Sequence, residues 1–273
     1  MINKTVTGSI VLYNTDIDEI TNLIEFILKK IDYLYLIDNS PTDKLKDLAS
    51  IGDNLDYFHL SSNPGFGVAH NVTIRNSIES GSKYHFIINP DIEIREDVFT
   101  PMIDFMEKHP DVGMMMPKVL NKDGSVQNLP KLLPHPVWIF RRKLKKIDPF
   151  GKAFINNYEL RMVPKDLIYN VPILSGCFTL LRLDAIKKVG MYDENFFMYF
   201  EDFDFSRRMH QKYKTVYFPE VSVIHGYEGG ANKSWKLFKI FIKSMITYFN
   251  KWGWFFDEER KKFNKETLKQ FKK

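Results

Sequence analysis

The chain has 273 residues, a formal net charge of +5 and a single cysteine, Cys177. This length suits one large α/β domain or two small ones and is sufficient to bury a core. One cysteine excludes a disulfide scaffold and a multi-cysteine zinc site, and it leaves a reducing cytosol as the default compartment. No run of about 18 apolar residues is present, so we expect no membrane span, and the start at Asn3 and Lys4 is not typical of a signal peptide.

The charge is divided unevenly along the chain. Residues 233–273 contain 12 Lys and Arg against 4 Asp and Glu, which gives this segment a net charge of +8. Residues 1–232 contain 27 basic and 30 acidic residues and carry a net charge of −3. A mildly acidic body argues against nucleic acid as a partner, and a basic tail favours contact with an anionic surface.

The first 120 residues alternate between strand-like and helix-like segments. We expect strands at 6–13, 33–37, 57–60, 84–88 and 112–116, and helices at 17–30, 68–80 and 98–108. This alternation predicts an α/β fold with a mostly parallel central sheet flanked by helices. Ligands of such sheets bind at the carboxyl ends of the strands, so the turns that follow these strands should converge on one crevice.

The second half of the chain departs from this rhythm. Asp123-Gly124 signals a hairpin, and residues 130–172 are rich in loops. Within that loop-rich part, the basic and apolar segment 138–147 is expected to be a mobile or acceptor-facing excursion. Further expected elements are a long strand at 173–183, a helix at 199–211, and short strands at 215–218 and 221–225.

Asn89-Pro90-Asp91 directly follows the strand expected at 84–88. One interpretation is ordinary turn chemistry, which a proline and a neighbouring carboxylate commonly supply. The other is that Asp91 binds Mg²⁺ or Mn²⁺, because these hard cations prefer oxygen ligands and are often completed by substrate phosphates. The position at the expected crevice favours the metal.

A second group of acids stands at the start of the helix expected at 199–211. Glu201, Asp202 and Asp204 follow a run of aromatic residues. Acids at a helix N-terminus can simply stabilise the helix dipole, while the aromatic residues fill the core. Alternatively, one carboxylate is a general base whose pKa is raised by apolar surroundings. The residues alone leave both interpretations open.

His225 ends a predicted strand and precedes a glycine-containing stretch at 226–230. A lone histidine is more often structural than a ligand. Here the glycines that follow it would make a flexible loop able to close over a bound molecule.

The turn at 63–71 contains Gly65 and Gly67 but is not a dinucleotide-binding fingerprint. The third glycine of that fingerprint would fall at His70, and the turn follows the third strand rather than the first. It is a glycine turn that lets backbone approach a ligand, with Asn63 and Asn71 as polar anchors.

Taken together and in order, six short segments resemble glycosyltransferase family 2, the inverting GT-A enzymes, and within it the bacterial rhamnosyltransferase-like branch. The resemblance covers about residues 5–230. The segments are Val11-Leu12-Tyr13-Asn14, Ile37-Asp38-Asn39-Ser40, the turn at 63–71, Asn89-Pro90-Asp91, Leu174-Ser175-Gly176-Cys177, and Gly190-Met191-Tyr192-Asp193-Glu194 leading to Glu201-Asp202. The resemblance implies a GT-A catalytic domain at 1–232, with a nucleotide-binding half at 1–120 and an acceptor-binding half at 121–232.

The resemblance also implies roles for single residues. Asp202 corresponds to the general base, with Glu201 as a supporting acid. Asp91 corresponds to the last acid of a metal-binding Asp-x-Asp motif, whose first acid is Asn89 here, and His225 to a histidine that completes the Mg²⁺ or Mn²⁺ site. Asp38 would accept the imide N–H of uracil or thymine. The full set implied to bind the donor nucleotide is Tyr13, Asn14, Asp38, Asn63, Gly67, Asn71, Asn89 and Gly176.

The implied activity is metal-dependent transfer of a sugar, with inversion, from a UDP- or dTDP-sugar. Rhamnose is the favoured sugar, and the acceptor is a saccharide or lipid-linked glycan in cell-surface polysaccharide synthesis. The alternatives are a non-catalytic sugar-nucleotide-binding module and a sugar nucleotidyltransferase. The latter would have a Gly-rich, Arg-containing loop directly after the first strand, and residues 13–16 contain none.

The segment 233–273 is expected to be a basic amphipathic helical tail. Lys236, Lys239 and Lys243 follow helical spacing among aromatic and aliphatic residues. One interpretation is a helix docked on the catalytic body with its lysines solvated. The other is an interfacial helix on anionic lipid, with Trp252 and Trp254 near the headgroups. The second makes the chain a cytoplasmic protein that lies peripherally on the inner face of the membrane and explains a lipid-linked acceptor.

Overall fold

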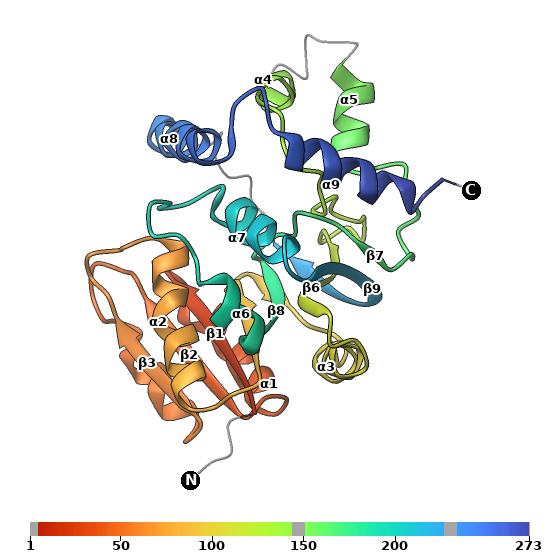
Figure 1. Ribbon diagram of the computed structural model, residues 1–273. Coiled ribbons are helices and arrows are strands. Elements are labelled where there is room, and N and C mark those ends of the chain that lie inside the picture. Colours follow the sequence, from red (N-terminus) through yellow and green to blue (C-terminus); the bar gives the residue numbers. More distant parts are fainter. Residues whose placement is uncertain (1–4, 144–150, 227–233, 273) are drawn as a thin grey trace.

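The computed structural model describes residues 5–143, 151–226 and 234–272. In these ranges nine strands form one mixed sheet, with helices packed around it (Figure 1). The strands are β1 Val6–Leu12, β2 Tyr33–Asp38, β3 Leu55–His59, β4 Tyr84–Ile88, β5 Ile92–Glu93, β6 Val112–Leu120, β7 Tyr169–Asn170, β8 Phe178–Arg182 and β9 Lys214–His225. The helices are α1 Ile17–Leu28, α2 Phe66–Glu79, α3 Phe99–Lys108, α4 Pro136–Lys143, α5 Gly151–Tyr158, α6 Leu183–Val189, α7 Glu201–His210, α8 Trp235–Trp252 and α9 Glu258–Lys269, with a 3₁₀ turn at Lys46–Ile51.

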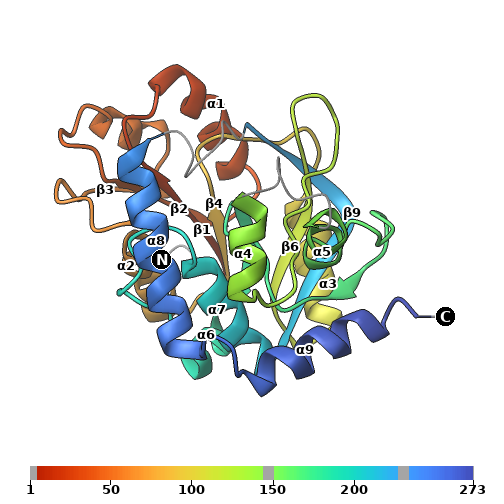
Figure 2. The ribbon, with the colours of Figure 1, turned by 90° about the horizontal axis from the view of Figure 1, so that it is seen from above.

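The alternation expected in the first half is confirmed. The strand order is β3-β2-β1-β4-β8-β6-β9-β5, and β3, β2, β1 and β4 are all parallel. Every residue of β2 and β4 is buried, as expected for strands covered on both faces. In Figures 1 and 2, α2 and α6 cover one face of this half and α1 covers the other. The carboxyl ends of the parallel strands therefore lie together at one edge.

Local sequence explains α1. Asp16 caps the helix by accepting a hydrogen bond from the backbone N–H of Asp18 at 2.9 Å. Apolar residues at helical spacing then form the buried side of the helix. These buried residues are Ile20, Leu23, Ile24 and Ile27.

The second half differs from the sequence expectation in two places. The long strand expected at 173–183 is only β8, which begins at Phe178 and runs antiparallel to β4 and β6. Residues 173–177 instead approach α7, and this approach requires an irregular backbone. The two short strands expected at 215–218 and 221–225 form one strand, β9, whose pairing with β6 shifts register between Pro117 and Lys118.

The tail consists of α8 and α9, and the second half of α8 is docked on the body. Ser244, Met245, Tyr248 and Phe249 are buried there. The first half is more exposed, with 69% of the Trp235 surface accessible. None of the helices in the described parts of the chain combines the length and apolarity that crossing a bilayer would need.

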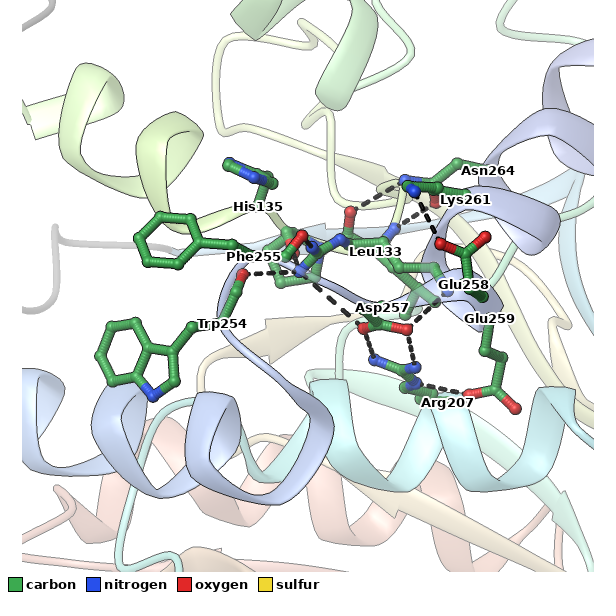
Figure 3. A network of polar contacts seen from close by, with 12 residues as sticks. Leu133, His135, Arg207, Trp254, Phe255, Asp257, Glu258, Glu259, Lys261 and Asn264 are labelled. Carbon is green, nitrogen blue, oxygen red and sulfur yellow. Dashed lines mark hydrogen bonds and ion pairs between the residues drawn. The ribbon is translucent and has the colours of Figure 1, made fainter.

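A buried ionic network joins the tail to α7 (Figure 3). The guanidinium of Arg207 donates two hydrogen bonds of 2.8 Å to Asp257, the N-cap of α9, and one of 2.8 Å to Glu259. The same guanidinium lies over the ring of Trp252, with its central carbon 4.2 Å from the ring centroid. Asn264 of α9 exchanges hydrogen bonds with the backbone of Leu133, so the tail also fixes the segment before α4.

Two sequence expectations fall wholly or partly outside the described residues. The glycine stretch after His225, expected to form a closing loop, includes residues 227–230. The expected excursion at 138–147 includes residues 144–150, while α4 occupies its beginning.

Candidate active site

A cleft of about 780 Å³ lies at the carboxyl ends of the parallel strands. Its floor comes from the turns after β1, β2 and β4, and its walls come from the 63–66 turn, residues 197–198 and the start of α8. The cleft is lined by Val11, Tyr13, Asn14, Thr15, Asp16, Glu19, Asn39, Asn63, Gly65, Phe66, Asn89, Pro90, Asp91, Phe197, Met198, Lys236, Leu237 and Ile240. The predicted convergence of strand-end turns on one crevice is therefore present.

The turns after β1 and β2 are tied to each other. The backbone N–H of Asn14 donates to Ser40 Oγ at 2.8 Å. Asp38 is fully buried beneath the cleft and does not line it. Its Oδ1 accepts the Ser40 N–H at 2.8 Å, and its Oδ2 accepts the Tyr57 hydroxyl at 2.7 Å. Asn39 does line the cleft, and its buried Oδ1 has no hydrogen-bond partner among the described residues.

The glycine turn at 63–71 contributes unequally to the cleft. Asn63 and Gly65 line it, and the positive φ of Gly65, 101°, lets the chain approach Phe197. Gly67 and Asn71 lie away from the cleft. A Cβ on Gly67 would be 2.8 Å from Tyr192, and the Asn71 amide exchanges two hydrogen bonds of 2.9 Å with the Tyr192 backbone. These two residues hold the 190–200 loop.

Asp91 meets His225 at one end of the cleft. Asp91 Oδ1 lies 3.2 Å from His225 Nε2, and the Asn89 amide nitrogen lies 3.4 Å from the same atom. Burial raises the pKa of Asp91, but the hydrogen bond and charge of His225 outweigh burial and place this pKa below its ordinary value. Gln127 contacts the other ring nitrogen of His225 at 3.4 Å and orients the ring.

This arrangement fits a cation that the substrate helps to hold. No group of three or more His, Cys, Asp or Glu side chains is placed to hold a metal in the described ranges. Asp91 and His225 supply two ligand types suited to Mn²⁺, and Mg²⁺ or Mn²⁺ sites are often completed by water and substrate phosphates. Asn89, whose amide contacts His225, adds a further oxygen: its Oδ1 is buried and has no hydrogen-bond partner in the described structure.

A second pocket of about 450 Å³ lies next to the cleft and contains the acids of α7. It is lined by Asn121, Val126, Gln127, Asn128, Leu129, Lys131, Ile139, Glu159, Arg161, Ser175, Tyr199, Phe200, Glu201, Asp202, Phe203, His225 and Phe241. His225 therefore belongs to this pocket while its partner Asp91 lines the cleft. The two hollows meet at this pair.

Backbone strain positions Glu201 and Asp202. Tyr199 and Phe200, the two residues before α7, have φ values of 67° and 61°, a conformation unfavourable for aromatic residues. Asp202 Oδ2 accepts the backbone N–H of Gly176 at 2.9 Å, and its buried Oδ1 has no hydrogen-bond partner among the residues described. Any Cβ at position 176 would collide with the Asp202 carboxylate. Gly176 therefore allows the close approach of this turn to Asp202.

The pKa values of the two acids are shifted upward. Burial raises the pKa of Asp202 to about 6, against the lowering effects of the Gly176 N–H and the charge of Lys131. Burial and the neighbouring charge of Asp202 raise the pKa of Glu201 well above its usual range. The same burial therefore disfavours the charged form of both carboxyls, and the pKa of Asp202, at about 6, leaves it ionised at neutral pH.

Cys177 connects the cleft to the acid pocket. Its carbonyl accepts the Asn89 backbone N–H at 2.8 Å, and it directly follows Gly176, which contacts Asp202. Burial raises the pKa of its thiol to about 12, with further contributions from the charges of both Asp202 and Asp91. The backbone around Cys177 therefore links the turn that carries Asp91 to the turn that contacts Asp202.

Three residues of the site were not predicted from the sequence. Lys131 is buried in the acid pocket and its charge acts on Asp202. Asn39 lines the cleft where Asp38 was expected, and Lys236 lines it from α8. The motif that contains Asp38 also contains Asn39, but no signal in the sequence separates Lys236 from the other lysines of the tail.

The fold and the site together define a protein of the GT-A type. The structure is similar to that of GalNAc-T7 solved with UDP, GalNAc and Mn²⁺, with a TM-score of 0.62 and 16% sequence identity over 89% of this chain and 47% of that one. The family model of Glycosyl transferase family 2 matches residues 9–190. The chain belongs to this family, which confirms the predicted family and fold class.

Two curated relatives are rhamnosyltransferases. The N-acetylglucosaminyl-diphospho-decaprenol L-rhamnosyltransferase of Mycobacterium tuberculosis is 27% identical over 70% of this chain, which spans 65% of that protein. The rhamnosyltransferase WbbL of Escherichia coli is 24% identical over 85% of this chain and 88% of its own length. This chain thus spans somewhat less than two thirds of the mycobacterial relative and less than half of GalNAc-T7.

Proposed function

We propose that the protein is an inverting glycosyltransferase that transfers a sugar, with rhamnose favoured, from a dTDP- or UDP-sugar to a saccharide or lipid-linked glycan. Its place is the synthesis of cell-surface polysaccharide. The observation that carries this proposal is the junction of the strand-end cleft with the acid pocket, where Asp91 contacts His225 and Cys177 joins the backbone of Asn89 to the turn that contacts Asp202. The two rhamnosyltransferase relatives support the donor sugar, and the lipid diphosphate in the name of the mycobacterial one supports the acceptor.

In this proposal Asp202 is the general base. The acceptor hydroxyl enters the acid pocket, gives its proton to Asp202 and attacks the anomeric carbon of the donor, while the bond from that carbon to the nucleoside diphosphate breaks. Asp202 suits this role because its pKa near 6 keeps it ionised at neutral pH yet more basic than an ordinary carboxylate. Glu201 supports it as a neighbouring buried acid, and Gly176 orients the carboxylate.

Asp91 and His225 would hold the Mg²⁺ or Mn²⁺, with Asn89 beside them. Such a cation neutralises the charge that develops on the departing diphosphate. The Mn²⁺ in the GalNAc-T7 structure supports its use by this fold. The chain's own contribution is to fix Asp91 and His225 3.2 Å apart at the end of the cleft.

The nucleotide base would lie beside Tyr13 and Asn14, with Asn63 lining the same cleft. Asp38 remains the family-derived candidate for the imide N–H. Asn39 is a second candidate, because it lines the cleft, which Asp38 does not, and its buried Oδ1 has no hydrogen-bond partner in the described structure. Calorimetric binding of dTDP and UDP distinguishes them: the base-reading residue is the one whose variant, Asp38→Asn or Asn39→Ala, loses affinity for the nucleotide while keeping the native fold.

The outer face of α8 would contact an anionic membrane on its cytoplasmic side. Trp235, Phe238, Ile242 and Ile246 line a shallow groove there together with Lys239 and Lys243. Exposed aromatic residues beside lysines suit the headgroup region of anionic lipid. We expect Trp235→Ala/Ile242→Ser to stop co-flotation with phosphatidylglycerol vesicles, whereas a variant that still floats would contradict lipid contact by this face.

The proposed function is tested by release of nucleoside diphosphate from a panel of dTDP- and UDP-sugars, with and without glycan acceptors. A transferase releases diphosphate faster with its acceptor, a binding module releases none, and a nucleotidyltransferase releases pyrophosphate only from a sugar phosphate and a nucleoside triphosphate.

For Asp202→Asn we expect a 10²–10⁴-fold lower kcat with an unchanged donor Kd, because general-base assistance is worth about that factor. Full transfer activity in Asp202→Asn would exclude it as the base.

A further inference from the structure

The charges that line the cleft do not suit a diphosphate. Among its described lining residues, Asp16, Glu19 and Asp91 carry carboxylates, and Lys236 is the single cation. A nucleoside diphosphate sugar adds two negative charges of its own. One divalent cation at Asp91 and His225 leaves the loaded cleft with an excess of negative charge. The repulsion among these charges is stronger in surroundings of low dielectric constant. A second positive group in contact with the phosphates would reduce this repulsion.

Lys236 differs from the neighbouring lysines of α8 in the hollow that it lines. It stands in the first turn of the helix and lines the cleft together with Leu237 and Ile240. Lys239 and Lys243 lie further along the helix and line the separate groove around Trp235. Figures 1 and 2 both show α8 over the ends of the strands β1 and β2.

Docking of α8 fixes the position of Lys236. The helix begins beside the cleft, where Ser234 Oγ caps it by accepting the Leu237 N–H at 3.2 Å. Further along, Ser244 Oγ donates to the carbonyl of Met198, a lining residue of the cleft, at 2.8 Å. Lys251 makes ion pairs with Asp193 and Asp204 at 2.5 and 2.8 Å. The cation is therefore carried by a helix attached to the walls of the cleft.

We propose that Lys236 binds the diphosphate of the sugar-nucleotide donor and stabilises it as it departs, from the α8 side of the cleft. This inference rests on the proposed function, because it presupposes that the cleft holds a nucleoside diphosphate sugar. Residue 236 lies in the tail, beyond the family match at 9–190. The tail thereby becomes part of the donor site.

The test is calorimetric binding of dTDP and UDP to the full-length chain in the presence of Mn²⁺ and the absence of vesicles. We expect Lys236→Ala to raise the Kd of both nucleotides about tenfold, and Lys236→Arg to restore most of the affinity. Lys239→Ala and Lys243→Ala are matched controls, since they remove the same charge from the same helix at positions that line the groove around Trp235 rather than the cleft. Their Kd values should remain within twofold of the wild type. Added NaCl should weaken binding less in Lys236→Ala than in the wild type, because one phosphate contact is gone.

The outcomes separate this inference from the proposed function. If the wild type binds neither nucleotide, the proposed function fails. If the wild type binds and Lys236→Ala binds equally well, Lys236 has no role and the proposed function stands. An equal loss in all three alanine variants indicates the general charge of the helix and also overturns the inference. Thymidine, which lacks phosphates, should bind the wild type and Lys236→Ala with the same affinity.

Discussion

At the scale of the residue, the environment of Asp202 sets the pH at which the proposed chemistry operates. Burial against Phe200 and Phe203 disfavours its charge, whereas the Gly176 N–H and Lys131 favour it, and the balance places its pKa at about 6. A base with this pKa is ionised at neutral pH and becomes protonated in mild acid. Lys131 matters here because removing its charge would push that pKa further up.

We therefore expect kcat/KM for sugar transfer to fall below about pH 6, by about tenfold for each further pH unit. The sign follows from the role: the protonated carboxyl cannot accept the acceptor's proton. Initial rates of transfer between pH 5 and 8 measure this. In Lys131→Met the midpoint should move to higher pH, whereas Lys165→Met, whose ammonium contacts Asn128 nearby, should keep the wild-type midpoint. A profile that is flat from pH 8 to 5 would argue against Asp202 as the base.

The residues of the site differ in how well the sequence predicts them. Asp91, Asp202 and His225 stand in short motifs next to expected strand ends or helix starts, so the topology of an α/β sheet is sufficient to bring them together. Lys131 and Asn39 are different. Lys131 reaches the acid pocket from a loop whose path depends on long-range packing. Asp38 is held by the Tyr57 hydroxyl of the next strand, and Asn39 lines the cleft instead.

At the scale of the element, the buried network on α7 determines how well its catalytic N-terminus is held. Arg207 and Asp257 are only 2% and 3% exposed, and both guanidinium–carboxylate hydrogen bonds are 2.8 Å long. Asp257 also caps α9 through the Arg260 N–H. The tail therefore supports the helix that begins with Glu201 and Asp202, although it lies far from them in sequence.

We expect Asp257→Asn to lower the free energy of unfolding by about 3–5 kcal/mol, because the Arg207 charge remains buried with its main partner weakened. Asp184→Asn is the matched control: its partner Lys187 is 47% exposed, and loss of such a surface pair costs about 0–1 kcal/mol. Urea denaturation of both variants measures the difference. Equal stability of the two variants would mean that the network does not hold the tail on α7.

Element boundaries show where local sequence is not decisive. Residues 173–177 are as apolar as a strand, and the sequence predicts one there, yet the contact of Gly176 with Asp202 bends the backbone away from the sheet. In the tail, helical spacing places Lys236, Lys239 and Lys243 in one series. Where α8 begins and how it docks through Tyr248 and Phe249 decide that the first lines the cleft and the other two line the groove around Trp235.

At the scale of the whole molecule, a buried polar cluster lies between β1, β4 and α2. His85 contacts Thr7 and Ser77 through Nδ1 at 2.8 and 3.0 Å, and Ser9 through Nε2 at 2.8 Å. Ser9 in turn contacts His70 at 2.7 Å. Burial lowers the pKa of His85 to about 3 and that of His70 well below its usual value, so both are neutral in the folded chain.

These histidines make the fold sensitive to acid. Their folded pKa values lie below the unfolded value near 6.5, so the unfolded chain binds more protons and stability is lost as pH falls below about 6.5. Burial also lowers the pKa of His210, to about 4. Asp202 opposes this effect, because its raised pKa makes the folded chain bind a proton between about pH 6 and 4, and the raised pKa of Glu201 acts in the same direction. Three histidines against two carboxyls leave a net loss of stability in mild acid.

We expect the free energy of unfolding, measured by urea titration at several pH values from 7.5 to 5, to decrease toward the acid end. Each neutral buried histidine contributes a slope of up to about 1.4 kcal/mol per pH unit below pH 6.

His85→Asn retains polar atoms for Thr7 and Ser9 but cannot gain the charge, so its slope should be smaller by about one such contribution. Asp202→Asn should have the opposite effect and steepen the loss, because it removes a group that gains a proton in the folded chain. Parallel pH dependence in the wild type and both variants would show that the burial of these groups does not control acid stability.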